Sequence, residues 1–224
     1  YIQVPDGSEK AMQLTKDNDT YITGFEWSPD SKKIMYADRK SNLYILDIAT
    51  KKRTLILHSE YGYRGMSYSW SPDSKWVAYS KSESNEMSVV YLYNVEQNKS
   101  YPVTDKWYSS RSPQFSVDGK YLFFVSSRDF NPIYARNEWN VVYTAMDKPY
   151  FAILSKDTPS PFADTDDEVK ASDDSKAADA KKPDAAIANK DVKIDIDGIQ
   201  NRIESLPVAV GSYGNISSVN DKVY

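Results

Sequence analysis

The sequence contains no cysteine and only one histidine, His58. Without cysteine the chain has no disulfide bond, no thiolate metal site and no cysteine nucleophile. A Ser-His-Asp triad requires a histidine base, but His58 follows a predicted outer strand and precedes Ser59 and Glu60, which is typical of a loop at a strand end. No Gly-x-Ser-x-Gly turn is present either. We therefore assign no catalytic residue to this chain.

The sequence also lacks a basic stripe and a long apolar run. Its formal net charge is -4 and its lysine and arginine residues are scattered, whereas a nucleic-acid interface requires clustered positive charge. No segment approaches the roughly 18 apolar residues of a membrane-spanning helix, and the first residues do not resemble a signal peptide. We expect neither a nucleic-acid partner nor a membrane span.

What the chain does have is a high content of strand-forming aromatic residues, arranged in a repeat. Aromatic residues make up 13% of the sequence and tyrosine alone contributes 18 residues, which favours strands over helices. The segment WSPDSK at Trp27–Lys32 recurs at Trp70–Lys75 and, more loosely, as FSVDGK at Phe115–Lys120. The aromatic residues that open these segments are 43 and 45 positions apart, and a period of about 40 to 50 residues is typical of four-stranded propeller blades.

Each copy of the repeat is expected to form a corner between two strands. The aromatic residue ends an apolar strand and packs between neighbouring sheets, a proline fixes φ in the turn, and the aspartate accepts hydrogen bonds from backbone amides just downstream. We therefore expect Trp27, Trp70 and Phe115 to be buried at equivalent places. The pattern predicts further strands at residues 33–37, 42–48, 53–57, 76–80, 87–95, 100–104 and 121–125.

The strands predicted after the third copy of the repeat do not follow the same spacing. The third strand of this blade is predicted to be doubled or extended through residues 139–143 and 150–154. Residues 164–190 are mainly Ala, Asp and Lys and bury too little apolar surface to offset the entropy of ordering, so we interpret them as a mobile insertion with solvated acidic residues. A strand at residues 192–196 and an outer strand at 202–208 are then expected to complete the blade.

Together these segments predict an all-β fold, a β-propeller of which the chain holds about three four-stranded blades. The complete propeller is expected to have six or seven blades, so the chain is interpreted as an incomplete arc. Because an open arc exposes apolar flanks and unpaired strand edges, we also expect self-association. The predicted divisions are an outer strand of a preceding blade at 1–15, blades at 16–58, 59–105 and 106–210, the insertion at 164–190 within the last of them, and the start of another blade at 211–224.

One segment comes close to a calcium-binding loop. With Lys193 counted as position 1, Asp195, Asp197, Gly198 and Glu204 fall at positions 3, 5, 6 and 12 of an EF-hand loop. A lysine in the place of the first acidic ligand repels calcium, and the alternation of Val192, Ile194 and Ile196 is typical of a strand. We interpret Asp197 and Gly198 as a turn and assign neither a metal site nor a cofactor.

Three arginines, Arg128, Arg136 and Arg202, allow two interpretations. They could face a pore and bind peptide carboxylates, or they could fix loops by donating to backbone carbonyls. Both interpretations stay open at this point, so no binding residue is assigned.

The second half of the chain carries several more specific motifs. These are the segments 127–130 (SRDF), 154–162 (LSKDTPSPF), 194–199 (IDIDGI), 202–203 (RI), 206–208 (LPV) and 211–213 (GSY). Together they resemble the tricorn-type proteases, and in particular a propeller that precedes the peptidase domains of that family. The Trp-Ser-Pro-Asp corners alone are less specific, since they are also similar to those of the Tol-associated propeller protein and of prolyl-oligopeptidase-type propellers.

The resemblance implies a non-catalytic segment of a tricorn-like serine peptidase, in which propellers filter and channel peptides to a peptidase module further along. It implies two kinds of partner, the remainder of the parent chain with its further blades and peptidase module, and the peptide substrates of the parent. Periplasm and cytoplasm are both consistent with the resemblance, and we favour the periplasm. The alternative is a protein-binding propeller of the Tol-associated type, with no peptidase domain.

Overall fold

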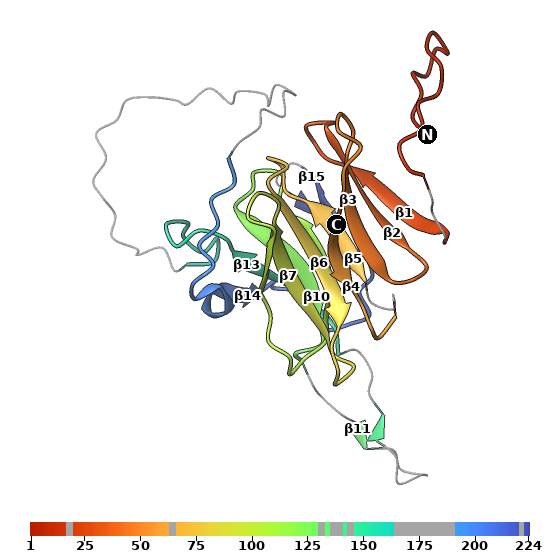
Figure 1. Ribbon diagram of the computed structural model, residues 1–224. Coiled ribbons are helices and arrows are strands. Elements are labelled where there is room, and N and C mark those ends of the chain that lie inside the picture. Colours follow the sequence, from red (N-terminus) through yellow and green to blue (C-terminus); the bar gives the residue numbers. More distant parts are fainter. Residues whose placement is uncertain are drawn as a thin grey trace, which may run out of the picture.

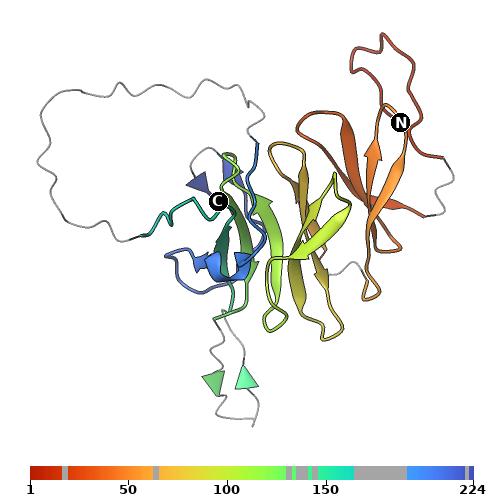
Figure 2. The same ribbon diagram turned by 60° about the vertical axis from the view of Figure 1, so that its left-hand side comes forward.

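A computed structural model shows three four-stranded antiparallel sheets that stand side by side as successive blades (Figure 1). The structure describes residues 1–16, 20–62, 66–129, 133–134, 141–142, 146–163, 191–219 and 222–224. The two ends of the chain lie at opposite ends of this row of blades (Figure 2). The three sheets confirm the predicted all-β propeller fold, and they form an arc that is not closed into a ring.

Each blade is a meander in which consecutive strands are neighbours. Blade 1 contains β1 (Ile22–Trp27), β2 (Lys33–Asp38), β3 (Asn42–Asp47) and β4 (Arg53–His58). Blade 2 contains β5 (Ser67–Trp70), β6 (Trp76–Ser82), β7 (Ser88–Asn94) and β8 (Lys99–Pro102). Blade 3 contains β9 (Ser110–Phe115), β10 (Tyr121–Ser126), β13 (Lys148–Ile153) and β14 (Ile203–Ser205).

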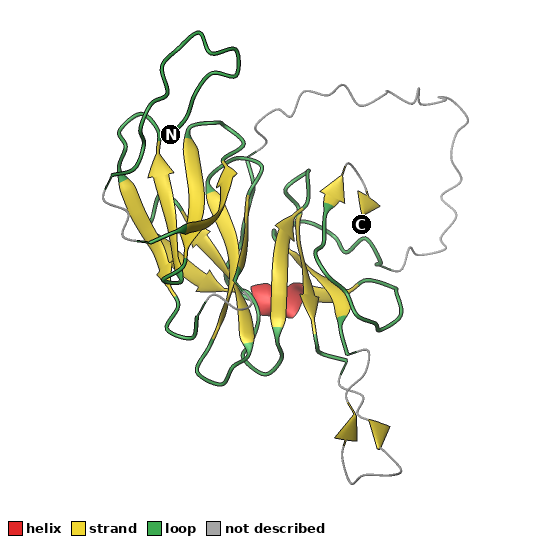
Figure 3. Cartoon of the chain, turned by 90° about the vertical axis from the view of Figure 1, so that its right-hand side faces the viewer, coloured by secondary structure: helices red, strands yellow, loops and turns green. Residues whose placement is uncertain are grey.

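Two predictions about blade 3 were wrong. Its third strand is β13 alone, because β11 (Ile133–Tyr134) and β12 (Val141–Val142) pair with each other in a separate hairpin that projects from the blade (Figure 3). Residues 192–196 form no strand, and their apolar side chains pack against the core between blades 2 and 3 instead. The short 3-10 helix η1 (Ile199–Arg202) then leads into β14. The insertion predicted at 164–190 lies outside the described residues.

Two short elements flank the blades. Ile2 and Met12 form a single antiparallel bridge near the start of the chain, and β15 (Ser218–Val219) pairs with β16 (Lys222–Val223) near its end. Among the described residues, no helix has the length and apolar character needed to cross a membrane.

The repeated motif forms the same hydrogen-bonded corner in all three blades. The hydroxyls of Ser28, Ser71 and Ser116 each donate to the aspartate two positions later, with an oxygen–oxygen distance of 2.6 Å in each case. The same aspartates accept the backbone amides of Lys32, Lys75 and Lys120 at 3.0 to 3.1 Å, as the sequence predicted. The repeat is therefore a turn that connects the first two strands of each blade.

In blades 2 and 3, the aromatic residue at the end of the first strand packs against the preceding blade. Trp70 joins a buried cluster with Met35 and Leu43 of blade 1, and Phe115 joins one with Val90 and Leu92 of blade 2. Both are almost fully buried, as predicted.

The prediction for Trp27 was wrong, because its side chain is 42% exposed. Trp70 and Phe115 are each covered by the preceding blade, and the equivalent cover for Trp27 would be a blade before blade 1. Among the described residues only the segment 1–16 lies on that side. Leu14 is buried there against Ile34, Tyr36 and Leu46, but this segment covers only part of the flank.

Candidate functional site

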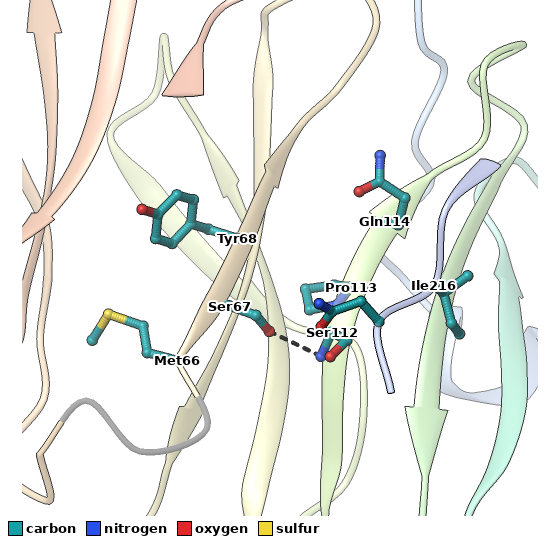
Figure 4. A pocket seen from close by; sticks show the side chains of 8 residues that line it. Met66, Ser67, Tyr68, Ser112, Pro113, Gln114 and Ile216 are labelled. Carbon is teal, nitrogen blue, oxygen red and sulfur yellow. Dashed lines mark hydrogen bonds between the residues drawn. The ribbon is translucent and has the colours of Figure 1, made fainter. Parts of the chain in front are cut away.

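The first strand of each blade forms its inner edge, and the inner edges of blades 2 and 3 lie in direct contact. A pocket of about 440 Å³ opens where β5 and β9 meet the chain that follows blade 3 (Figure 4). The pocket is lined by residues 66–68, by residues 112–114 and by residues 215–216. Three successive blade positions thus contribute to one site, which no single blade forms alone.

Serine hydroxyls hold the two inner strands together at this pocket. The Ser67 hydroxyl accepts the backbone amide of Ser112 at 2.9 Å and shares a hydrogen bond of 2.7 Å with the Ser80 hydroxyl (Figure 4). Ser112 has φ of 54°, in the left-handed region, and the register of β9 against β10 shifts around it. Such a bulge redirects the backbone out of the ladder. Here it directs an amide across to the neighbouring blade.

The inner edge of β5 leaves main-chain groups available beside the pocket. The amide of Ser71 donates to the carbonyl of Trp76 at 2.9 Å, so these two residues form a hydrogen-bonded pair of the ladder. Hydrogen-bonded and non-hydrogen-bonded pairs alternate in antiparallel sheets, which makes Tyr68 and Tyr79 a non-hydrogen-bonded pair. The amide and carbonyl of Tyr68 therefore point away from β6, while its ring points away from Ser112 (Figure 4).

The pocket is polar but carries no formal charge. None of its lining residues is acidic or basic. Burial, and secondarily the charge of Glu26, raises the pKa of the Tyr68 hydroxyl, so this group stays protonated at neutral pH. Burial also raises the pKa of Glu26 itself, against a hydrogen bond from the Trp70 amide that lowers it. The lining residues thus offer hydroxyls, side-chain amides and main-chain groups but no charged side chain.

Two of the three arginines that the sequence left undecided, Arg128 and Arg202, do not line this pocket. Arg202 donates to the carbonyls of Ile153, at 3.0 Å, and Asp197, at 3.1 Å, and also to that of Asp195, so it fixes the loop before β14. Arg128 pairs with Asp105 at 3.4 Å. Arg136 lies outside the described residues. For Arg202 the loop-fixing interpretation is correct.

The candidate calcium ligands do not converge. Asp195 accepts the backbone amide of Lys156 at 2.7 Å, and Asp197 pairs with the ammonium of the same lysine at 3.0 Å. Glu204 instead accepts the Ser160 hydroxyl at 2.5 Å. In the part of the chain that the structure describes, no three His, Cys, Asp or Glu residues gather in a way that could hold a metal ion.

The single histidine is the last residue of β4. His58 is exposed, and its Nδ1 lies 2.8 Å from the amide oxygen of Asn42. Its place at the end of β4 confirms the predicted strand-end position.

The pocket residues were missed by sequence reasoning. Ser67, Ser112 and Gln114 belong to no motif, and their strands were not singled out as lining anything. The pocket depends on the bulge at Ser112 and on the meeting of blades 2 and 3 with the chain that follows blade 3. The only signal in the sequence was their position a few residues before the repeated aromatic residue, on the strand that becomes the inner edge.

These features define the chain as an arc of four-stranded propeller blades with an uncharged pocket on its inner edge. Over residues 1–224 it matches the model of the tricorn protease second beta propeller domain, and it belongs to that family. This confirms the resemblance seen in the motifs of the second half.

Two curated relatives carry tricorn names. The chain is 29% identical to a Tricorn-like protease C-terminal subunit of Sulfurisphaera tokodaii, over 98% of this chain and 23% of the relative. It is 27% identical to a tricorn protease homolog of Saccharolobus solfataricus, over 98% of this chain and 18% of the relative. The chain thus spans about a fifth of the length of the curated relatives it matches.

A solved structure supports the fold. The crystal structure of the tricorn protease superposes on 90% of this chain and 18% of its own, with a TM-score of 0.71 and 20% sequence identity. At this level of identity the likeness establishes the propeller arrangement alone.

Proposed function

We propose that this chain is a non-catalytic propeller segment of a tricorn-like serine peptidase, and that it serves substrate access and scaffolding in peptide degradation. The observation that carries the proposal is the pocket on the inner edge, which combines an open main-chain edge with uncharged polar side chains. Peptides are recognised through main-chain pairing at exposed strand edges, so this chemistry suits a surface along which peptides pass.

Scaffolding is supported by the flank of blade 1. Phe25 is 69% exposed and Trp27 42% exposed, and together with Ile22 they form an apolar surface beside β1. Exposed apolar patches of this kind mark interaction sites. The partners that we propose are further blades and the peptidase module of a longer parent chain, as the length of the relatives suggests.

The test compares peptidase activity with and without an obstacle at the inner edge. This chain has no cysteine, so Asn215→Cys provides a single attachment point beside the pocket, in a parent protein whose other cysteines are replaced. Attachment of a large polyethylene glycol maleimide should slow hydrolysis of long peptides and leave hydrolysis of a short fluorogenic peptide unchanged.

The matched control attaches the same polymer at Gln200→Cys, on the exposed surface of η1, where neither rate should change. The isolated chain should hydrolyse neither substrate. Equal rates for long peptides with and without the polymer at position 215 would show that peptides do not reach the peptidase along this edge.

A further inference from the structure

We propose that the pocket between β5 and β9 is a binding site for one extended, uncharged stretch of peptide. This proposal rests on the proposed function, and it adds where on the inner edge a peptide binds and which kind of peptide sequence binds there. The occupant is a free oligopeptide, held by its main chain and by one or two small apolar side chains.

The open edge of β5 offers main-chain groups for pairing with a peptide. Tyr68 lies at a non-hydrogen-bonded position of the β5–β6 ladder, so its amide and carbonyl are directed to the open edge. An added strand can pair with both groups. β9 belongs to a different sheet and forms no ladder with β5; across this edge the Ser112 amide donates to the Ser67 hydroxyl.

Two side-chain amides in the pocket offer further hydrogen bonds to a peptide. Gln114 is half-buried in the pocket, and its amide makes no hydrogen bond to any residue that the structure describes. Asn215, from the chain that follows blade 3, also lines the pocket, is exposed and likewise has no such partner. A carboxamide both donates and accepts, so it matches the paired donor and acceptor of a peptide group.

Charge and size define the class of ligand. The lining residues carry no formal charge, so an anionic or cationic side chain would lose its hydration and find no ionic partner among them. Met66, Pro113 and Ile216 offer apolar surface between the polar groups. The volume of about 440 Å³ lies within the range of about 300 to 1,000 Å³ that is typical of ligand pockets. A neutral peptide with small apolar side chains fits these properties.

The experiment measures binding of a capped octapeptide of alternating serine and valine by isothermal titration calorimetry. Gln114→Ala should weaken binding about fivefold, the effect of one net hydrogen bond. Gln200→Ala, on exposed η1, is the matched control and should leave the affinity unchanged. Peptides in which lysine or glutamate replaces valine should bind more weakly than the uncharged peptide. Melting temperatures of both variants establish that they are folded.

A second measurement does not depend on any pocket variant. A photoreactive benzoylphenylalanine in the same peptide should crosslink to residues 66–68 or 112–114, as mapped by mass spectrometry. Three results would each overturn the pocket assignment and leave the proposed function standing. These are crosslinks confined to other segments, equal affinities of the two glutamine variants, and preference for a charged peptide. No binding of any peptide at millimolar concentration would overturn both.

Discussion

Trp27 and Trp70 occupy the same position of the same motif, yet their surroundings differ. Trp70 is 4% exposed and packs against blade 1, whereas Trp27 is 42% exposed beside the segment 1–16. The corners that hold the two residues have the same hydrogen bonds. The motif therefore determines where the aromatic side chain points, and the preceding blade determines whether it is buried. A propeller blade is stabilised largely by its neighbours, as expected for a repeat architecture.

The largest expected effect is a difference in stability between the two tryptophans. Trp70→Ala should lower the free energy of unfolding by about 3 to 5 kcal/mol, because it leaves a cavity between two blades. Trp27→Ala should lower it by only about 1 kcal/mol, since much of its surface is already in water. Urea denaturation of both variants measures the difference. Equal losses would contradict the dependence on a preceding blade.

The junction of blades 2 and 3 can be weakened at a glycine. A Cβ on Gly119 would lie 2.7 Å from Cγ2 of Val192, and its φ of 71° disfavours other residues. Gly119→Ala should therefore cost about 2 to 4 kcal/mol, from strain in the left-handed region and from overpacking.

Gly7→Ala is the matched control for this junction. Gly7 has the same φ of 71°, but nothing lies within 4 Å of a Cβ there, so a cost of about 1 kcal/mol is expected. Val192→Ala in the Gly119→Ala background should recover part of the loss. If the two glycine variants lose the same stability, Val192 does not fill the space that we assign to it.

The exposed flank of blade 1 leads to a prediction about assembly, which remains untested. We expect the isolated chain to associate with itself, because Phe25 and Trp27 leave apolar surface uncovered. Sedimentation equilibrium should show a molar mass that rises with concentration, and Phe25→Lys should shift the equilibrium toward monomer. A strictly monomeric chain that binds no hydrophobic dye would show that the flank is covered by other means.

The smallest expected effect is a pH dependence within blade 2, the blade that has neighbours on both sides. Burial opposes ionisation of Glu83, but hydrogen bonds from Tyr91, Lys106 and Lys81 outweigh it and lower the pKa of Glu83 to about 2. Because the pKa of Glu83 is lower in the folded state than its unfolded value of 4.5, ionised Glu83 stabilises the fold above pH 4.5. This stabilisation is lost as the pH falls toward 2. Glu83→Gln should flatten the loss of stability between these pH values in acid denaturation, whereas an unchanged slope would contradict this assignment.

The sequence predicted most of the fold, because the repeat is local chemistry. Each corner is made by a serine, an aspartate and amides within five residues, and the strands beside it follow from alternating apolar residues. The exposure of Trp27 and the packing of residues 192–196 depend on contacts between blades, which no local pattern encodes. The pocket was unpredictable for the same reason, since Gln114 and Asn215 meet only in the folded arc.

The most direct test of this account follows the environment of Trp27 itself. The chain is labelled with 5-fluorotryptophan, and the fluorine resonance of position 27 is assigned with Trp27→Phe. Its solvent isotope shift is then compared between this chain and a longer protein that carries a preceding blade. We predict a large shift for Trp27 in the isolated chain and a small one, like that of Trp70, in the longer protein. A large shift for Trp27 in both proteins would contradict the claim that each blade buries the aromatic residue of the next.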